Sequence, residues 1–153
     1  MYPFILFLHG LGRWLVLIGV LGAVLIAFMG WRRHWKFTPF INGWRHWTAT
    51  IAHLQLLLGV LLYFQSPVVA YAMPDDPGQL INEHTYFRYL HISLMFIAVV
   101  IVTIGSAKAK RAQVDQAKFR TMFLWFVAGL LIILVAIPWP FSPLASRPLL
   151  RGY

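Results

Sequence analysis

The sequence contains no cysteine among its 153 residues. Without thiols the chain has no disulfide, no thiolate metal site, no cysteine nucleophile and no covalently attached c-type haem. Charge is also scarce, because 11% of the residues are charged, against about 25% in soluble globular domains. So little polar surface excludes a water-soluble monomer. The hydrophobic fraction of 60% equally excludes intrinsic disorder, which requires low hydrophobicity.

Acidic side chains are the rarest charged groups. There are four, Asp75, Asp76, Glu83 and Asp115, and none lies inside a long apolar run. Carboxylate proton relays and paired-carboxylate catalysis are therefore not expected. The sequence also lacks a glycine-rich phosphate loop, and the pattern assigns no enzyme class.

Long apolar runs dominate what is present. A bilayer core ~30 Å thick requires about 20 mostly apolar residues in a helix. Because the connections are short, successive helices are expected to be antiparallel neighbours, which predicts an all-α, integral membrane, up-down four-helix bundle over residues 1–137. Residues 138–153 contain four prolines and are expected to form a non-helical tail. The predicted spans are residues 3–29, 44–71, 86–107 and 119–137.

The basic residues predict the orientation of the bundle. Nine of the thirteen flank the first and third connections, and the second connection carries acidic residues instead. The positive-inside rule then places the first and third connections in the cytoplasm and both termini outside. The net charge of +9 thus indicates membrane topology and not nucleic-acid binding. The nine residues are Arg32, Arg33, Lys36, Arg45, Lys108, Lys110, Arg111, Lys118 and Arg120.

Imidazole and arginine side chains stand out inside the predicted spans. Ionisable groups at membrane depth are costly and mark functional sites by default. His9 and Arg13 lie one turn apart on one face of the first span, and Arg88 and His91 lie on one stripe of the third, which Met95 extends.

Two of these histidines are expected at the same depth. At ~1.5 Å per residue, His9 lies about 12 Å and His91 about 9 Å from the middle of the membrane toward the outside. His53 lies about 5 Å toward the inside. The first and third helices are diagonal in an up-down bundle, so two imidazoles there point at the bundle axis from opposite sides. Neutral histidine is a haem ligand, and His9 and His91 are predicted to ligate the iron of a haem b.

The two arginines suggest a counter-ion. Arg13 has no carboxylate at its level, and a buried cation without an anion is strongly disfavoured. The anion would be a haem propionate, a lipid phosphate or a group of a neighbouring subunit. Arg88 lies one turn outward of His91, where a propionate would reach it; the alternative is that Arg88 snorkels to the outer surface.

The second span carries two more histidines. His53 is a candidate haem ligand or quinone contact, with Gln55 nearby, and a buried hydrogen bond competes equally with these roles. His46 lies between Trp44 and Trp47 and is better interpreted as an interfacial anchor.

Three strings carry a resemblance to a known family: LHGLGRW (8–14), RHWTATIAHLQLLLG (45–59) and TIGSAKAKR (103–111). The chain resembles, over residues 1–139, small bacterial inner-membrane proteins labelled cytochrome b. The resemblance implies a four-helix, haem b-binding protein of the bacterial inner membrane, and it carries over His9, His53 and His91, with Arg13 close by; the orientation above makes the tail periplasmic. The layout is also similar to the four-helix core of respiratory cytochrome b, except that no two helices each carry two histidines at the spacing that stacks two haems.

Three functions follow as hypotheses. The first is an electron-transfer module with haem b on His9 and His91, exchanging electrons with quinol or a respiratory partner. The second is a non-catalytic structural or assembly subunit of a larger respiratory membrane complex, with the tail docked on a partner; homo- and hetero-oligomers are both compatible with the sequence. The third is a copper- or haem-handling protein that uses His9, His53, His91 and Met95, since imidazole and thioether ligands suit Cu(I).

Overall fold

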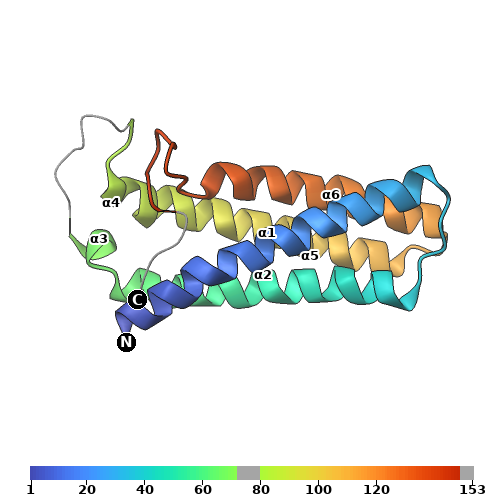
Figure 1. Cartoon of the computed structure of the whole chain (residues 1–153), viewed down its shortest axis with the longest axis horizontal. Coiled ribbons are helices and arrows are strands. Elements are labelled where there is room, and N and C mark those ends of the chain that lie inside the picture. The colour runs from blue at the N-terminus through green and yellow to red at the C-terminus, as the bar shows by residue number, and fades with distance from the viewer. Residues whose placement is uncertain (72–79, 149–153) are drawn as a thin grey trace.

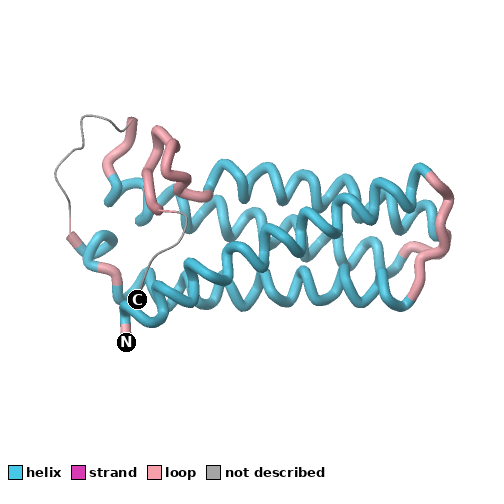
Figure 2. The backbone as a smooth tube through the Cα atoms, viewed as in Figure 1, coloured by secondary structure: helices cyan, strands magenta, loops and turns pink. Residues whose placement is uncertain are grey.

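The computed structural model describes residues 1–71 and 80–148. Within these two ranges the chain forms helices and loops and no strand (Figure 2). One short helix, α3, follows the second long helix, and the third long helix begins with two short pieces, α4 and η1. In chain order the elements are α1 (Tyr2–Arg32), α2 (Pro39–Gln65), α3 (Pro67–Ala70), α4 (Glu83–Thr85), the π-helix η1 (Tyr86–His91), α5 (Ile92–Arg111) and α6 (Asp115–Ala136).

In the described part of the chain, four helices are long and apolar enough to cross a membrane. They are α1, α2, the continuous helix Glu83–Arg111 formed by α4, η1 and α5, and α6. The all-α fold with four candidate spans is therefore confirmed. Large apolar side chains such as Leu15, Ile18 and Leu25 point outward and fit contact with lipid acyl chains, as expected for a multi-pass membrane protein.

The second span lies earlier in the chain than the predicted residues 44–71. The α2 helix begins at Pro39, behind an N-cap at Thr38 whose Oγ1 accepts a hydrogen bond from the Ile41 amide. Proline is well suited to the first helical position. The helix ends at Gln65, because Ser66 precedes Pro67 and takes the extended conformation that the proline ring favours for its predecessor.

The last two spans extend further into the polar connections than predicted. The third span covers Glu83–Arg111 instead of 86–107, and α6 begins at Asp115 instead of residue 119. The α6 helix stops at Ala136, since Ile137 precedes Pro138 and is extended.

Each of the four spans packs against two of the others, so the bundle is closed. The α1 helix packs against α2 and α6, and α5 packs against the same two helices, so α1 and α5 are diagonal. Figure 1 shows α1 crossing the bundle obliquely. An up-down order with diagonal first and third spans is what the short connections predict.

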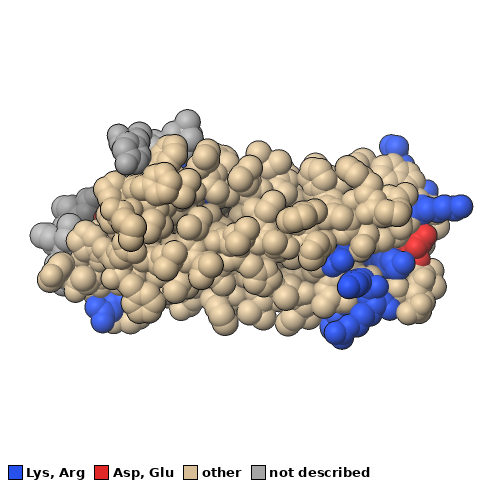
Figure 3. All heavy atoms as spheres, turned by 90° about the horizontal axis from the view of Figure 1, so that it is seen from below, with Lys and Arg blue, Asp and Glu red and all other residues tan. Residues whose placement is uncertain are grey.

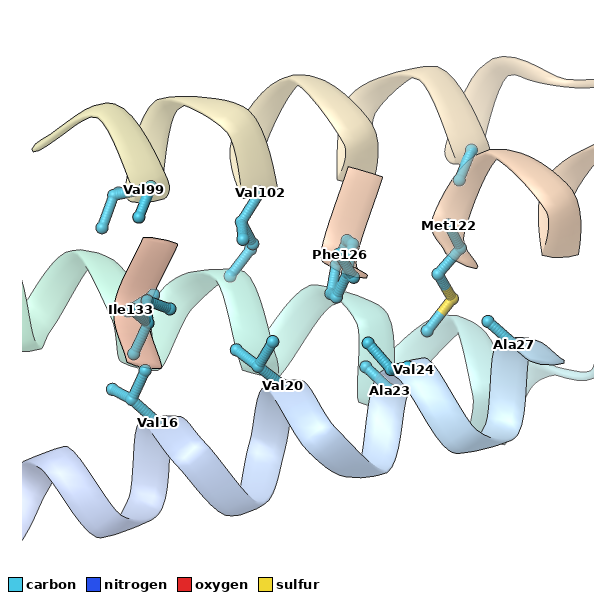
Figure 4. Close-up of a cluster of buried hydrophobic side chains, with 14 of the residues drawn as sticks. Val16, Val20, Ala23, Val24, Ala27, Val99, Val102, Met122, Phe126 and Ile133 are labelled. Atoms are coloured by element: carbon cyan, nitrogen blue, oxygen red, sulfur yellow. The ribbon is translucent and has the colours of Figure 1, made fainter. Parts of the chain in front are cut away.

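The hydrophobic core lies between the four long helices, with α2 contributing Ala49 and Ala52. Small side chains of α1, including the fully buried Ala23 and Ala27, face the larger Met122 and Phe126 of α6 (Figure 4). Alternating small and large residues let the helices interdigitate at close-packed density.

A buried arginine links α2 to α5. Arg45 is one of the nine basic residues that flank a connection, yet its side chain is only 4% exposed. Its guanidinium donates to Asn42 Oδ1, to the Ser106 backbone oxygen and to Ser106 Oγ. These acceptors satisfy the cation within the bundle, which a buried charge requires.

Lysine and arginine side chains gather at one end of the molecule, where the α1–α2 and α5–α6 connections lie (Figure 3). The described part of the tail, residues 138–148, lies at the opposite end and contains no helix. It folds back on its own bundle: the Leu80 amide donates to the Pro143 oxygen, and Trp139 Nε1 donates to the Leu134 oxygen. The remainder of the predicted tail, 149–153, lies outside the described residues.

We predict that Gly22→Ala destabilises the bundle. A Cβ at Gly22 would lie 2.7 Å from Cζ2 of Trp44, so the Trp44 ring, which is held by its hydrogen bond to the Gly19 oxygen, or the helices must shift at a cost of about 1–3 kcal/mol. Gly43→Ala is the control, because nothing lies within 4 Å of a Cβ there and alanine favours the helix by ~0.5–1 kcal/mol. Thermal unfolding in detergent should separate the two, with Gly22→Ala several degrees lower; equal melting temperatures would contradict this interface.

Candidate functional site

A cavity of about 230 Å³ lies between the helices at the end of the bundle opposite the basic connections. The four long helices all contribute to its wall, together with α3, η1 and the tail. Most of the wall is apolar, and the polar side chains on it are few: Tyr2, His9, Arg13, Gln55, Tyr63, Ser66, His91 and Arg147.

The cavity brings His9 and His91 together. Their ring centroids are 6.4 Å apart and the rings are inclined by 73°. The two side chains come from the diagonal pair α1 and η1–α5. The structure thus places at one level the two histidines that the depth estimate pairs.

His91 is held by the end of α6. Its Nδ1 lies 2.7 Å from the backbone oxygen of Ala136, and a carbonyl oxygen only accepts, so Nδ1 carries the proton. The hydroxyl of the fully buried Tyr86 donates to the same oxygen at 2.7 Å. The last carbonyls of a helix have no partner within the helix, so Ala136 is available for both donors. In this tautomer Nε2 of His91 keeps its lone pair.

His9 is positioned by α2. Gly59 leaves room for the His9 ring, because a Cβ there would lie 3.2 Å from Cε1 of His9. Gln55 Nε2 donates to the His9 backbone oxygen at 2.7 Å and joins α2 to α1. The buried Nδ1 of His9 has no hydrogen-bond partner among the described residues. A buried polar atom in this state calls for an explanation such as an ion or ligand.

Arg13 and Arg147 are the cations on the cavity wall. Arg13 donates through Nη2 to the Pro148 oxygen at 2.9 Å and lies over the Trp14 ring. Arg147 makes a bidentate pair with Glu83, with both N–O distances at 2.7 Å. The tail thus closes one side of the cavity with a charge-assisted fork, the strong form of such a contact.

Arg88 does not line the cavity. Its Nη1 donates to the Val69 oxygen at 3.2 Å, and its guanidinium lies over the Tyr89 ring. The tail contributes Arg147 to the cavity wall, a residue that the sequence did not single out. The reason is physical: a tail without regular periodicity carries no signal of where it folds.

His53 also lies outside the cavity. It is exposed on α2, its Nδ1 is 2.7 Å from the Ala49 oxygen, and its Nε2 is 3.2 Å from Thr103 Oγ1. His53 is therefore hydrogen-bonded, as its alternative role requires, but the side chain is exposed and not buried. His46 is exposed beside Trp47, in the part of α2 nearest the basic end of the bundle.

The ligand set proposed for copper is not assembled. Met95 lines the cavity with the two paired histidines, but His53 faces away. Within residues 1–71 and 80–148 there is no group of three or more histidine, cysteine or acidic side chains that could hold a metal ion. The site contains one pair of imidazoles. Two ligands suit a metal ion that is already bound within a cofactor.

Comparisons with protein-family models, with curated proteins and with solved structures find no match. The cytochrome b resemblance therefore rests on the three sequence strings.

We predict that Glu83→Gln releases the tail from the cavity. Ala145 is fully buried and the chain has no native cysteine, so Ala145→Cys gives a thiol that reacts with a water-soluble maleimide when the tail opens. Loss of the partly exposed Glu83–Arg147 pair, worth ~1 kcal/mol, should raise the labelling rate roughly fivefold.

The control in the same Ala145→Cys background is Asp115→Asn, which removes the 3.6 Å pair with Lys118 at the other end of the bundle. A labelling rate in Glu83→Gln no higher than in this control would show that the ion pair does not hold the tail.

Proposed function

We propose that the protein is a membrane-embedded b-type cytochrome, an electron-transfer module in which His9 and His91 hold one haem b. The observation that carries the proposal is the pair of imidazoles facing one cavity from diagonal helices, with ring centroids 6.4 Å apart. At this separation the two imidazoles would both be within reach of one metal ion held between them.

The donor set supports this group over a bare ion. Among the described residues, the cavity wall offers two imidazole side chains and no carboxylate or thiolate, a donor set that would suit haem iron. The hydrogen bond from His91 Nδ1 to Ala136 fixes the tautomer and the ring orientation, as partners of metal-bound histidines generally do. Arg13, one turn from His9, offers a guanidinium to a propionate.

The cavity is small for a whole porphyrin macrocycle. Its volume of about 230 Å³ lies below the ~300–1,000 Å³ of common ligand pockets. Binding a whole macrocycle therefore requires flexible wall side chains, such as Met95 and Leu56, to give way. Methionine is the side chain best suited to that role, because its three rotatable bonds let it fill irregular spaces.

When bound, haem b supplies a one-electron couple between ferric and ferrous iron. The chain's own contribution is to hold the two nitrogens, to exclude water with the tail and the apolar wall, and to place Arg13 nearby, where its positive charge favours the reduced state. We further infer that the basic end faces the cytoplasm of a bacterial cell, which puts the site near the periplasmic side, where quinol or a respiratory partner would exchange electrons.

We predict that the purified protein has a Soret band and reducible α and β bands, with one haem per chain by pyridine haemochrome. His9→Ala and His91→Ala should each lose most of the haem, because one ligand of the pair is removed. His53→Ala should keep the full amount, since that side chain is outside the cavity and serves as the matched histidine control.

A colourless wild-type protein would end the cytochrome proposal and favour the structural-subunit function. Loss of haem in His53→Ala, with haem retained in His91→Ala, would show that the pairing of His9 and His91 is wrong.

A further inference from the structure

Two side-chain donors meet at the last residue of α6. The Tyr86 hydroxyl and the His91 Nδ1 each lie 2.7 Å from the backbone oxygen of Ala136. Tyr86 is completely buried, and its ring centroid is 5.9 Å from that of His91. A carbonyl oxygen has two lone pairs, so these two donors occupy its capacity.

The π-helix explains why both donors reach one acceptor. Tyr86 and His91 are the first and last residues of η1, five positions apart. In an α-helix the neighbours on one face are three and four positions apart, whereas the i→i+5 bonds of a π-helix align residues five apart. Single π-turns within α-helices are rare and occur frequently at functional sites.

A shared acceptor weakens each bond that it receives, because each donor lowers the negative charge available to the other. The bond from Nδ1 matters to a metal-bound imidazole, since it raises the basicity of the ligating nitrogen. His9 has no equivalent bond at Nδ1 within the described part of the chain. Of the two paired histidines, His91 is thus the one whose basicity as a ligand this chain adjusts through a hydrogen bond.

We propose that Tyr86 is a positioning residue that tunes the redox potential of the bound haem by sharing the Ala136 oxygen with His91. This inference rests on the proposed haem site. Without the tyrosine hydroxyl, His91 would bond to Ala136 more strongly and donate more electron density to the iron. Ferric iron would then be favoured, and the midpoint potential would fall.

The test is Tyr86→Phe, which keeps the buried ring and removes the hydroxyl. Tyr89→Phe is the matched control, because it also removes one tyrosine hydroxyl from the same π-helix. Tyr89 is 56% exposed. Spectroelectrochemical titration of the wild type and both variants gives the midpoint potentials, and the haem content is measured on the same samples.

We expect full haem content in all three proteins and a lower midpoint potential in Tyr86→Phe alone. At a fixed ambient potential, the ratio of oxidised to reduced haem should rise about two- to tenfold, the usual range for one hydrogen bond. Electron paramagnetic resonance of the ferric protein should also show a changed low-spin signal in Tyr86→Phe, since this signal reports the ligand field of the imidazoles.

The possible failures are distinguishable. A wild-type protein without haem overturns the proposed function and this inference together. If Tyr86→Phe binds the full amount of haem and has the wild-type midpoint potential, the tuning role of Tyr86 is wrong and the proposed haem site is unaffected. Loss of haem from Tyr86→Phe also overturns the tuning role, because the hydroxyl would then hold the site together instead of adjusting it.

Discussion

The carbonyl of Ala136 is the acceptor on which the rest of the site depends. Inside a membrane every backbone polar group must be satisfied by the protein, and the end of a helix leaves its last carbonyls without partners. Here Pro138 prevents α6 from continuing, and Tyr86 and His91 satisfy the freed oxygen. Terminating one helix therefore fixes the tautomer and direction of an imidazole on another.

The two ends of the bundle solve the problem of buried polarity differently. At the basic end, Arg45 finds all its acceptors on Asn42 and Ser106, so the charge is satisfied inside the protein. At the opposite end, His9 keeps a buried nitrogen without a partner in the described chain. The first arrangement stabilises the packing of α2 on α5, while the second leaves a group able to bind something that the chain does not supply.

The tail converts an open bundle end into a walled cavity. Arg147 reaches Glu83 at the start of the third span, and the Pro148 oxygen accepts from Arg13 of α1. These contacts join the last described residues to the first and third spans. A reactive group beneath them would be shielded from water, which strengthens electrostatic interactions in its surroundings.

The sequence by itself determined the four spans, their antiparallel order and the shared depth of His9 and His91, because apolar length and rise per residue are local properties. Proline at 67 and 138 could have given the true helix ends as well. Tertiary structure alone decided that His53 is exposed, that Arg147 and not Arg88 lines the cavity, and that Tyr86 and His91 share one oxygen. These outcomes depend on the rotation of each helix, on a π-turn that shifts the register, and on the path of an aperiodic tail, none of which leaves a periodic trace in the residues.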